Sequence, residues 1–280
     1  MFQNKNKIKR EKLDIISNIF VVLFAILSLF PLYWLITSSF KTSAAVLKMP
    51  PDWIPKTFHV SNYVDVFGSK PALKWAFNSI LVSSVTTIAL VIVSSLAAYA
   101  FSKLNFKGRN IIFIVFVSSL MIPKEVMLVP LFRIIQDFGW VNSLNGMIWP
   151  NVATAFGVFL LRGFFDTVPD SLREAARIDG ARELRIFYKI MLPIVKPGIA
   201  ALFILNFVEV WNDYLWQLVM LNDDSKLTIT VGISTFVSEY VAQYGKQMAA
   251  ATIGFIPIFV LFLSFQRHFV KGITIGSIKG

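Results

Sequence analysis

Four polar side chains recur along one apolar stretch around residue 210. Asn206, Glu209, Asp213 and Gln217 follow one another at spacings of three, four and four, so a helix would place them on one face. Ionised carboxylates are costly in hydrocarbon, so this face should look inward. It could line a path for a polar solute or bond neighbouring helices together, and the pattern fits both. With the residues between them, the candidate lining is Asn206, Glu209, Trp211, Asn212, Asp213, Tyr214 and Gln217.

A second group of polar residues lies between two apolar stretches. Ser171 and Glu174 have the spacing of a capping box, which predicts a helix starting at Leu172. Gly180 can adopt the left-handed conformation that ends such a helix. Small alanines between charged side chains would leave the helix backbone approachable by a partner. The candidate docking residues are Ser171, Arg173, Glu174, Ala175, Ala176, Asp179, Gly180 and Ala181.

A further short helix is expected after the glycine, from about Ala181 to Met191, with Pro193 as its stop. One side of it is apolar and would pack on the ends of membrane helices. The prediction is therefore two helices joined at a glycine elbow, one anchored and one offered to a partner. The apolar face comprises Leu184, Phe187, Tyr188 and Met191.

Several kinds of chemistry are excluded by composition. The 280 residues contain no cysteine, which rules out disulfides, thiolate metal sites and a cysteine nucleophile. The two histidines, His59 and His268, are too distant in sequence to predict a metal or catalytic cluster. The chain has no G-x-x-x-x-G-K-[ST] loop for nucleotide phosphates. We expect no catalytic residue, no metal site and no cofactor bound by this chain.

The elements that must position these residues are membrane helices. The chain is 56% hydrophobic and 15% charged, too apolar for a soluble domain. Its net charge of +11 lies in Lys and Arg between apolar blocks rather than on one water-exposed face, which argues against nucleic acid. Five stretches could each cross about 30 Å of hydrocarbon. They are Ile15–Ser39, Phe77–Phe101, Leu144–Phe165, Gly198–Leu221 and Gln247–Phe265.

A sixth span is expected at Ile111–Ile122, although this apolar stretch is only 12 residues long and ends at Pro123. It could cross if the helix continued past Pro123 into 126–128. A short interfacial helix is then predicted over Leu131–Phe138, with Gly139 as its stop. The polar residues Ser83, Ser84, Thr86, Thr87, Ser94 and Ser95 are expected to pack closely between helices.

Orientation follows from the Lys and Arg count on alternate sides of six spans. One set of loops and ends carries 18 of these residues and the other set carries nine. By the positive-inside rule, both termini and the 162–196 loop are expected in the cytoplasm. The predicted fold class is an all-α polytopic membrane protein with six transmembrane helices, formed as one domain over 1–280 with a core at 70–270 and an N-terminal span at 15–39.

The segment 169–197, which contains the two predicted short helices, resembles the signature cytoplasmic loop of ABC importer permeases. The resemblance lies in the string Glu174-Ala175-Ala176-x-x-Asp179-Gly180-Ala181, followed by Phe187, Ile190, Leu192-Pro193 and Lys196-Pro197. Other strings resemble the carbohydrate-uptake branch, in particular the maltose-type second permease. They are Pro50-Pro51-x-Trp53-x-Pro55, Asn62-Tyr63, Asn78-Ser79, Ala97-Ala98-Tyr99-Ala100-Phe101, Gly108-Arg109, Phe156-Gly157-x-Phe159-Leu160-Leu161-Arg162-x-Phe164-Phe165 and Trp211-Asn212-Asp213-Tyr214-Leu215-Trp216.

The resemblance covers about residues 28–270 and implies a function. The first short helix would be a coupling helix seated in a groove of a separate ATPase, which binds ATP and Mg, with Glu174 facing a basic residue there. The implied partners are a homologous second permease, two ATPase copies, an extracellular solute-binding protein and a sugar. The first outer loop, 41–74, is more compact than that of the maltose permease, so the sugar cannot be inherited from it.

Two other classes of protein are alternatives. A secondary transporter or channel would be expected to show inverted repeats or broken, ion-coordinating helices and no docking loop. A membrane-embedded transferase would need catalytic acids or a metal-ligand cluster near an interface, whereas acidic residues outside the fifth span are scattered. The loop favours the importer permease over both.

Overall fold

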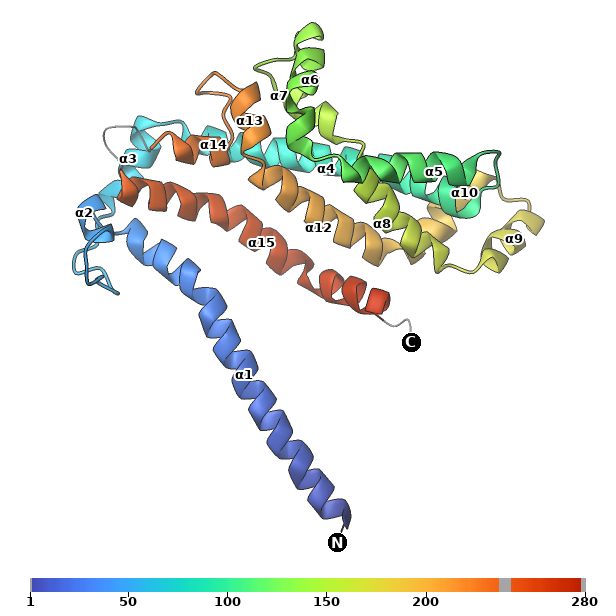
Figure 1. Cartoon of the computed structure of the whole chain (residues 1–280), viewed down its shortest axis with the longest axis horizontal. Helices are drawn as coiled ribbons and strands as arrows, with labels where there is room; N and C mark the ends of the chain where they lie inside the picture. Colours follow the sequence, from blue (N-terminus) through green and yellow to red (C-terminus); the bar gives the residue numbers. More distant parts are fainter. Residues whose placement is uncertain (1, 237–242, 278–280) are drawn as a thin grey trace. The chain divides into compact units, whose positions relative to one another are not determined.

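The computed structural model describes residues 2–236 and 243–277, and side chains from 15 to 264 within them except Ile16 and Ser69. Over this part the chain is all-helical (Figure 1). The helices are α1 Phe2–Ser39, α2 Ser43–Val46, α3 Ser61–Ser69, α4 Ala72–Lys103, α5 Arg109–Ser118, α6 Lys124–Asp137, α7 Leu144–Ile148, α8 Ala155–Asp166, α9 Asp170–Ile178, α10 Glu183–Ile186, α11 Leu192–Ile194, α12 Lys196–Asn212, α13 Leu215–Met220, α14 Ile229–Ser234 and α15 Tyr244–Ser277.

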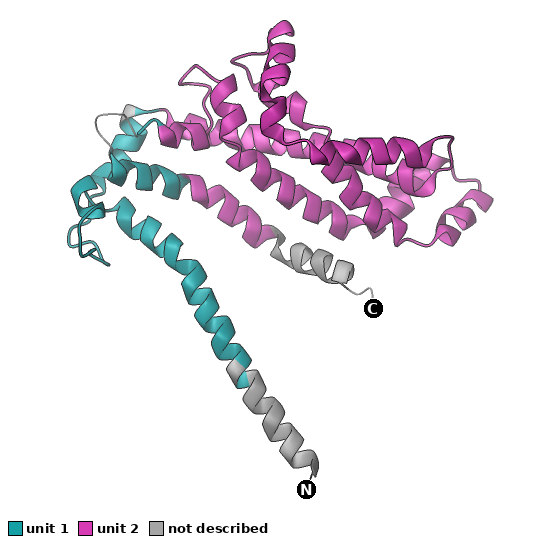
Figure 2. Cartoon of the chain, viewed as in Figure 1, with its two compact units in different colours: residues 1–70, 235–253 teal, residues 71–234, 254–280 magenta. Residues whose placement is uncertain are grey.

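The chain divides into two compact units (Figure 2): residues 1–70 with 235–253, and residues 71–234 with 254–280. In the first unit, the Asn62 amide donates hydrogen bonds to the carbonyls of Ser39 and Lys41, both at 2.8 Å. Lys246 pairs with Asp65 at 3.0 Å. These bonds hold the segment that follows α1 to α3 and to the start of α15.

Three helices are long and apolar enough to cross a membrane: Ser17–Ser39, Ala72–Lys103 and Tyr244–Ser264. Three bent pairs of helices meet the same criterion of length and apolar composition when each pair is counted as one span. This gives up to six candidate spans. The all-α prediction is confirmed. The charge-based prediction of cytoplasmic termini rests partly on side chains at 1–14 and 265–280, which lie outside the described residues.

The expected course of the third span is wrong. α5 ends at Ser118, a short 3₁₀ turn follows over Ser119–Met121, and α6 begins at Lys124 with a bend of 103° between the two halves. Pro123 causes the break, because it lacks an N–H and keeps the preceding Ile122 extended. α6 therefore runs over Lys124–Asp137 instead of starting near residue 131.

The core of the second unit is the packing of α4 on α8 and α12, which lie side by side in Figure 1. A Cβ atom on Gly157 would lie 2.5 Å from the Ser94 Oγ, and one on Gly198 would overlap the ring of Phe164. Glycine is therefore required at both contacts. The close packing expected of the second-span hydroxyl residues is confirmed for those that are buried, namely Ser83, Thr86, Thr87, Ser94 and Ser95.

The first turns of α4 hold the segment that precedes α14. The Trp75 Nε1 donates to the Asp224 carbonyl at 2.7 Å, and the Asn78 amide donates to the Leu227 carbonyl at 2.9 Å. The Ser79 hydroxyl accepts from the Ile229 N–H at 2.8 Å. Three successive polar side chains thus tie one end of α4 to a loop about 150 residues away in sequence.

Candidate functional site

The short helix of the loop begins two residues earlier than predicted. α9 starts at Asp170 after Pro169, and no side chain caps it, so the predicted capping box is not formed. The Asp170 carboxylate lies in the first turn, where a negative charge is favourable. It is also bound by the ammonium of Lys103 at 2.8 Å, which lowers the pKa of Asp170 below its usual value. An ion pair with α4 therefore replaces the expected local cap.

The glycine elbow is confirmed. Gly180 has a φ of +78°, in the left-handed region. The Ala181 N–H donates to the Ala176 carbonyl at 2.9 Å, and the Gly180 N–H donates to the Arg177 carbonyl at 3.0 Å. This pair of bonds is the Schellman pattern that satisfies carbonyls at a helix end.

The segment after the elbow differs from the single helix expected over 181–191. α10 covers Glu183–Ile186, a π-helical turn covers Phe187–Met191, and α11 continues through Pro193 to Ile194. Pro193 does not stop the helix, because it occupies an early position in α11 where an N–H is not needed. The predicted apolar face is half right: Phe187 and Met191 are buried with Ile186, whereas Leu184 and Tyr188 are exposed.

Ion pairs clamp α9 against the segment after the elbow. The Arg173 guanidinium donates to both carboxylate oxygens of Glu183, at 2.7 and 3.2 Å. Arg177 pairs with the same carboxylate at 3.3 Å. The Tyr99 hydroxyl of α4 donates to it as well. A bidentate Arg–carboxylate pair is geometrically specific, so the angle between α9 and α10 is well defined.

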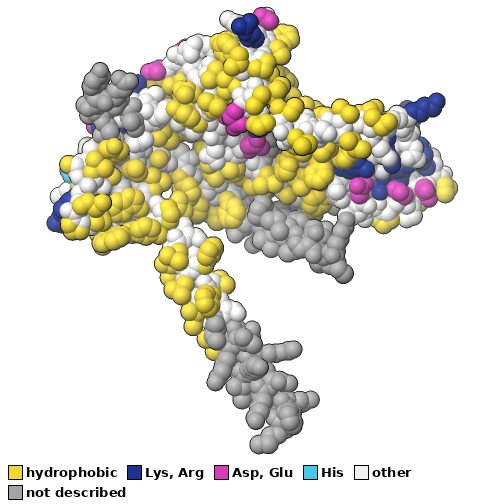
Figure 3. Space-filling view, in the orientation of Figure 1, with side chains coloured by type: hydrophobic (Ala, Val, Ile, Leu, Met, Phe, Trp, Pro, Cys, Tyr) yellow, Lys and Arg dark blue, Asp and Glu magenta, His cyan; other side chains and the backbone are white. Residues whose placement is uncertain are grey.

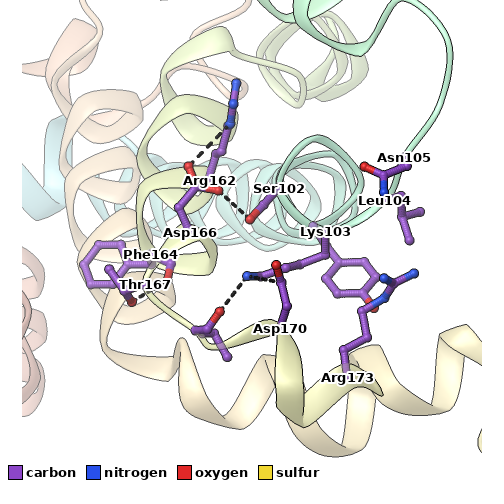
Figure 4. A network of polar contacts seen from close by, with 12 residues as sticks. Ser102, Lys103, Leu104, Asn105, Arg162, Phe164, Asp166, Thr167, Asp170 and Arg173 are labelled. Carbon is purple, nitrogen blue, oxygen red and sulfur yellow. Dashed lines mark hydrogen bonds and ion pairs between the residues drawn. The ribbon is translucent and has the colours of Figure 1, made fainter. Parts of the chain in front are cut away.

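A polar network joins the same region to α4 and α8 (Figure 4). The Lys103 ammonium donates to the Val168 carbonyl at 2.6 Å as well as to Asp170. The Ser102 hydroxyl donates to Asp166 at 2.6 Å, and Arg162 lies 3.6 Å from the same carboxylate. The end of α4 therefore holds the end of α8, the linker and the first residue of α9.

The opposite face of α9 is open. Ser171, Glu174, Ala175, Asp179 and Gly180 are exposed, Arg173 and Ala181 are half-buried, and Ala176 is buried. Ile178, which was not predicted as a site residue, is 87% exposed. In Figure 3 charged side chains gather at the end of the second unit that carries α9, beside a mostly hydrophobic surface. The exposed face combines the carboxylates of Glu174 and Asp179 with the apolar side chain of Ile178.

The polar stripe near residue 210 does not form one helical face. α12 ends at Asn212, and Asp213 is extended, with its carboxylate accepting from the Trp216 N–H at 3.2 Å as α13 begins. Gln217 therefore belongs to another helix. The prediction of a continuous stripe is wrong because the Asp213 side chain caps a new helix instead of continuing the old one.

Three of the predicted pathway residues are buried within this chain. The Asn206 amide donates to the Thr87 hydroxyl of α4 at 3.0 Å. The Gln217 amide donates to the Val210 carbonyl at 2.8 Å and is bound by the Thr228 hydroxyl. Trp211 is also buried. Their observed bonds stabilise the packing of the chain on itself.

The other four predicted pathway residues are accessible. Glu209, Asn212 and Tyr214 are exposed and Asp213 is half-buried. Glu209 forms an ion pair with Lys124, the first residue of α6 after the Pro123 break. This bend therefore brings a cation beside α12, which the expected straight third span did not suggest. Sugar contact by these residues stays a prediction.

Besides Ile178 and Lys124, sequence reasoning missed Tyr99, Lys103 and Glu183. Tyr99 lies in a string quoted for its resemblance, but nothing in the string indicates its bond. Lys103 counted only as a basic residue at a span end. Glu183 is ten residues from Arg173 across a turn, so no helical spacing links them.

The comparisons with known proteins agree with this architecture. The family described as binding-protein-dependent transport system inner membrane component matches residues 90–275. The chain belongs to this family. It is an inner-membrane multi-pass permease subunit of an ABC importer, and the ATPase is a separate subunit.

Two relatives span nearly the whole permease. The arabinooligosaccharides transport system permease protein AraQ of Bacillus subtilis is 34% identical over 265 residues, covering 94% of each chain. The diacetylchitobiose uptake system permease protein NgcG of Streptomyces coelicolor is 31% identical over 268 residues, covering 94% of this chain and 88% of the relative.

A solved structure has the same fold. It is a chain of a bacterial ABC transporter involved in the import of the acidic polysaccharide alginate, with a TM-score of 0.79 at 24% identity. The match covers 91% of this permease and 95% of that chain. The helical architecture is therefore shared over almost the full length.

Proposed function

We propose that this permease forms half of the pathway of an ATP-driven sugar importer, with an oligosaccharide as substrate, and receives its energy through α9. The 280 residues act as one transmembrane domain in the bilayer, with both termini in the cytoplasm. Its partners are a homologous second permease, two copies of an ATPase that bind ATP and Mg, and an extracellular solute-binding protein. No nucleic acid takes part.

The observation that carries the docking role is the two-sidedness of α9. Arg173 and Arg177 bind Glu183 behind the helix, whereas Glu174 and Ile178 are exposed in front. Ile178 is 87% exposed, so it offers apolar surface that a docked partner would bury. A groove with an apolar floor and a basic residue would complement both exposed side chains.

The proposed substrate class follows from the relatives. The names of AraQ and NgcG concern arabinooligosaccharides and diacetylchitobiose. The accessible polar residues of this permease suit such a solute, because carboxylates and amides hydrogen-bond sugar hydroxyls and the Tyr214 ring can stack on a sugar face. We therefore place the pathway contacts at Glu209, Asn212, Asp213 and Tyr214.

A charge-neutral substitution tests the docking role. Glu174→Gln keeps the size of the side chain and removes its charge, and Asp137→Asn makes the same kind of change at the exposed end of α6. We expect Glu174→Gln to weaken co-purification with the ATPase and to reduce ATP-driven uptake of labelled oligosaccharides in proteoliposomes, while Asp137→Asn retains both. Unchanged assembly and uptake in Glu174→Gln would remove the docking role.

The side of the membrane is a separate test. Because the chain has no cysteine, an Ile178→Cys variant carries a single thiol. We expect a membrane-impermeant maleimide to label it in inverted vesicles and not in right-side-out vesicles. Labelling from the outside, or uptake by the isolated permease without an ATP-hydrolysing companion, would overturn the proposed function.

A further inference from the structure

The loop is attached to one transmembrane helix at two points, one on each side of the elbow. Before the elbow, Lys103 holds the Val168 carbonyl and the Asp170 carboxylate. After the elbow, Tyr99 holds the Glu183 carboxylate. Tyr99 and Lys103 are four residues apart on α4 and therefore lie on the same helical face, one turn apart.

We propose that Tyr99 and Lys103 form the joint through which movement of α9 enters the membrane, and that α4 is the helix that receives it. This inference rests on the proposed function, in which an ATPase moves α9. It assigns the receiving helix and two positioning residues, neither of which touches the ATPase or the sugar.

The first reason is that α9 cannot tilt without disturbing both contacts. Arg173 joins α9 to Glu183 by two hydrogen bonds, and Glu183 is bound in turn by Tyr99. Asp170, the first residue of α9, is paired with Lys103. The start and the middle of the short helix are therefore connected to α4 by charged hydrogen bonds, which are stronger than neutral ones.

The second reason is the burial of the two α4 side chains. Tyr99 is 4% exposed and packs on the rings of Phe165 and Phe187. The Lys103 side chain is also 4% exposed. A buried ammonium that loses its partners is strongly unfavourable, so Lys103 must follow the carbonyl and carboxylate that it binds.

The third reason is the position of α4 in the second unit. It packs on both α8 and α12 and bonds to Asn206 through Thr87. Its 32 residues extend about 48 Å at the usual helical rise, and its far end holds the loop before α14 through Trp75. A movement delivered to the last turn of α4 therefore reaches the residues around the proposed pathway.

The test separates assembly of the transporter from the coupling of ATP hydrolysis to sugar transport. Tyr99→Phe removes only a hydroxyl, and Lys103→Met removes the ammonium at similar length. Lys107→Met is the matched control, because Lys107 is an exposed cation four residues further along. Each variant is purified with its ATPase, second permease and binding protein, and reconstituted in proteoliposomes to measure complex yield, ATP hydrolysis and transported sugar per ATP.

We expect Tyr99→Phe and Lys103→Met to assemble and hydrolyse ATP, with at least a threefold fall in sugar transported per ATP, and the double variant to fall at least tenfold. Lys107→Met should transport as much sugar per ATP as the wild type. Lys103→Arg should retain at least half of the wild-type amount of sugar transported per ATP. If complex yield falls but sugar per ATP is unchanged, the two residues are merely structural and the inference is wrong. Failure of the wild-type chain to assemble with an ATPase would instead refute the proposed function.

Discussion

The buried bond between Asn206 and Thr87 allows a sharp test of whether Asn206 packs helices or contacts sugar. Asn206 is 5% exposed and Thr87 is fully buried, with 3.0 Å between the amide nitrogen and the hydroxyl oxygen. Thr87→Val leaves the amide without this partner, which should cost about 1–3 kcal/mol in unfolding free energy. Replacing both residues, by Thr87→Val with Asn206→Leu, leaves no polar group of this pair without a partner. The double variant should therefore lose less than the two single variants added together.

The expected coupling free energy is about 0.6 kcal/mol and at most about 1.7 kcal/mol, the range measured for bonds between membrane helices. It is obtained from a double-mutant cycle of reversible unfolding in mixed detergent–SDS micelles. Thr252→Val is the control, because the Thr252 hydroxyl donates to the Met248 carbonyl of its own helix and should contribute little. In Thr87→Val, Asn206→Leu and the double variant, the sugar concentration that gives half-maximal uptake should equal that of the wild type. Additive losses, or a shifted sugar dependence in Asn206→Leu at unchanged stability, would refute the packing role.

Two further predictions concern the loop. Gly180→Ala should destabilise the elbow by about 1–2 kcal/mol, because an alanine at φ +78° is strained although no atom lies within 4 Å of its Cβ. Gly163→Ala is the control, because Gly163 is equally open but helical, and it should be neutral or stabilising. The protease sensitivity of the loop in the two variants reports the difference. The lowered pKa of Asp170 means that its ion pair stabilises α9 fully above about pH 4, the ordinary value for an aspartate, and loses this contribution as pH falls through the lowered pKa. Asp170→Asn should abolish that acid dependence of loop protection, and an unaltered profile would contradict it.

The sequence predicted the features that depend on local pattern. Continuous apolar stretches predicted the spans because hydrocarbon demands them, and Gly180 predicted the elbow because only glycine adopts that conformation readily. The hydroxyl residues of the second span predicted close helix packing. Each of these inferences needs only a residue and its near neighbours.

The features that were missed depend on distant partners. Ser171 and Glu174 matched a capping box, but α9 begins at Asp170, which Lys103 binds from another helix. The stripe from Asn206 to Gln217 matched helical spacing, but Asp213 capped a new helix. A charged partner 67 residues away cannot be found from the spacing of a loop.

The attachment of α4 at both ends limits the motions open to it. Lys103 is bonded at one end, and Trp75, Asn78 and Ser79 are bonded at the other. Sliding α4 along its axis would stretch all of these bonds together. Rocking α4 about its middle, where Leu90 lies close to Gly157, would move its two ends in opposite directions. The segments bonded to the two ends would then be carried in opposite directions as well.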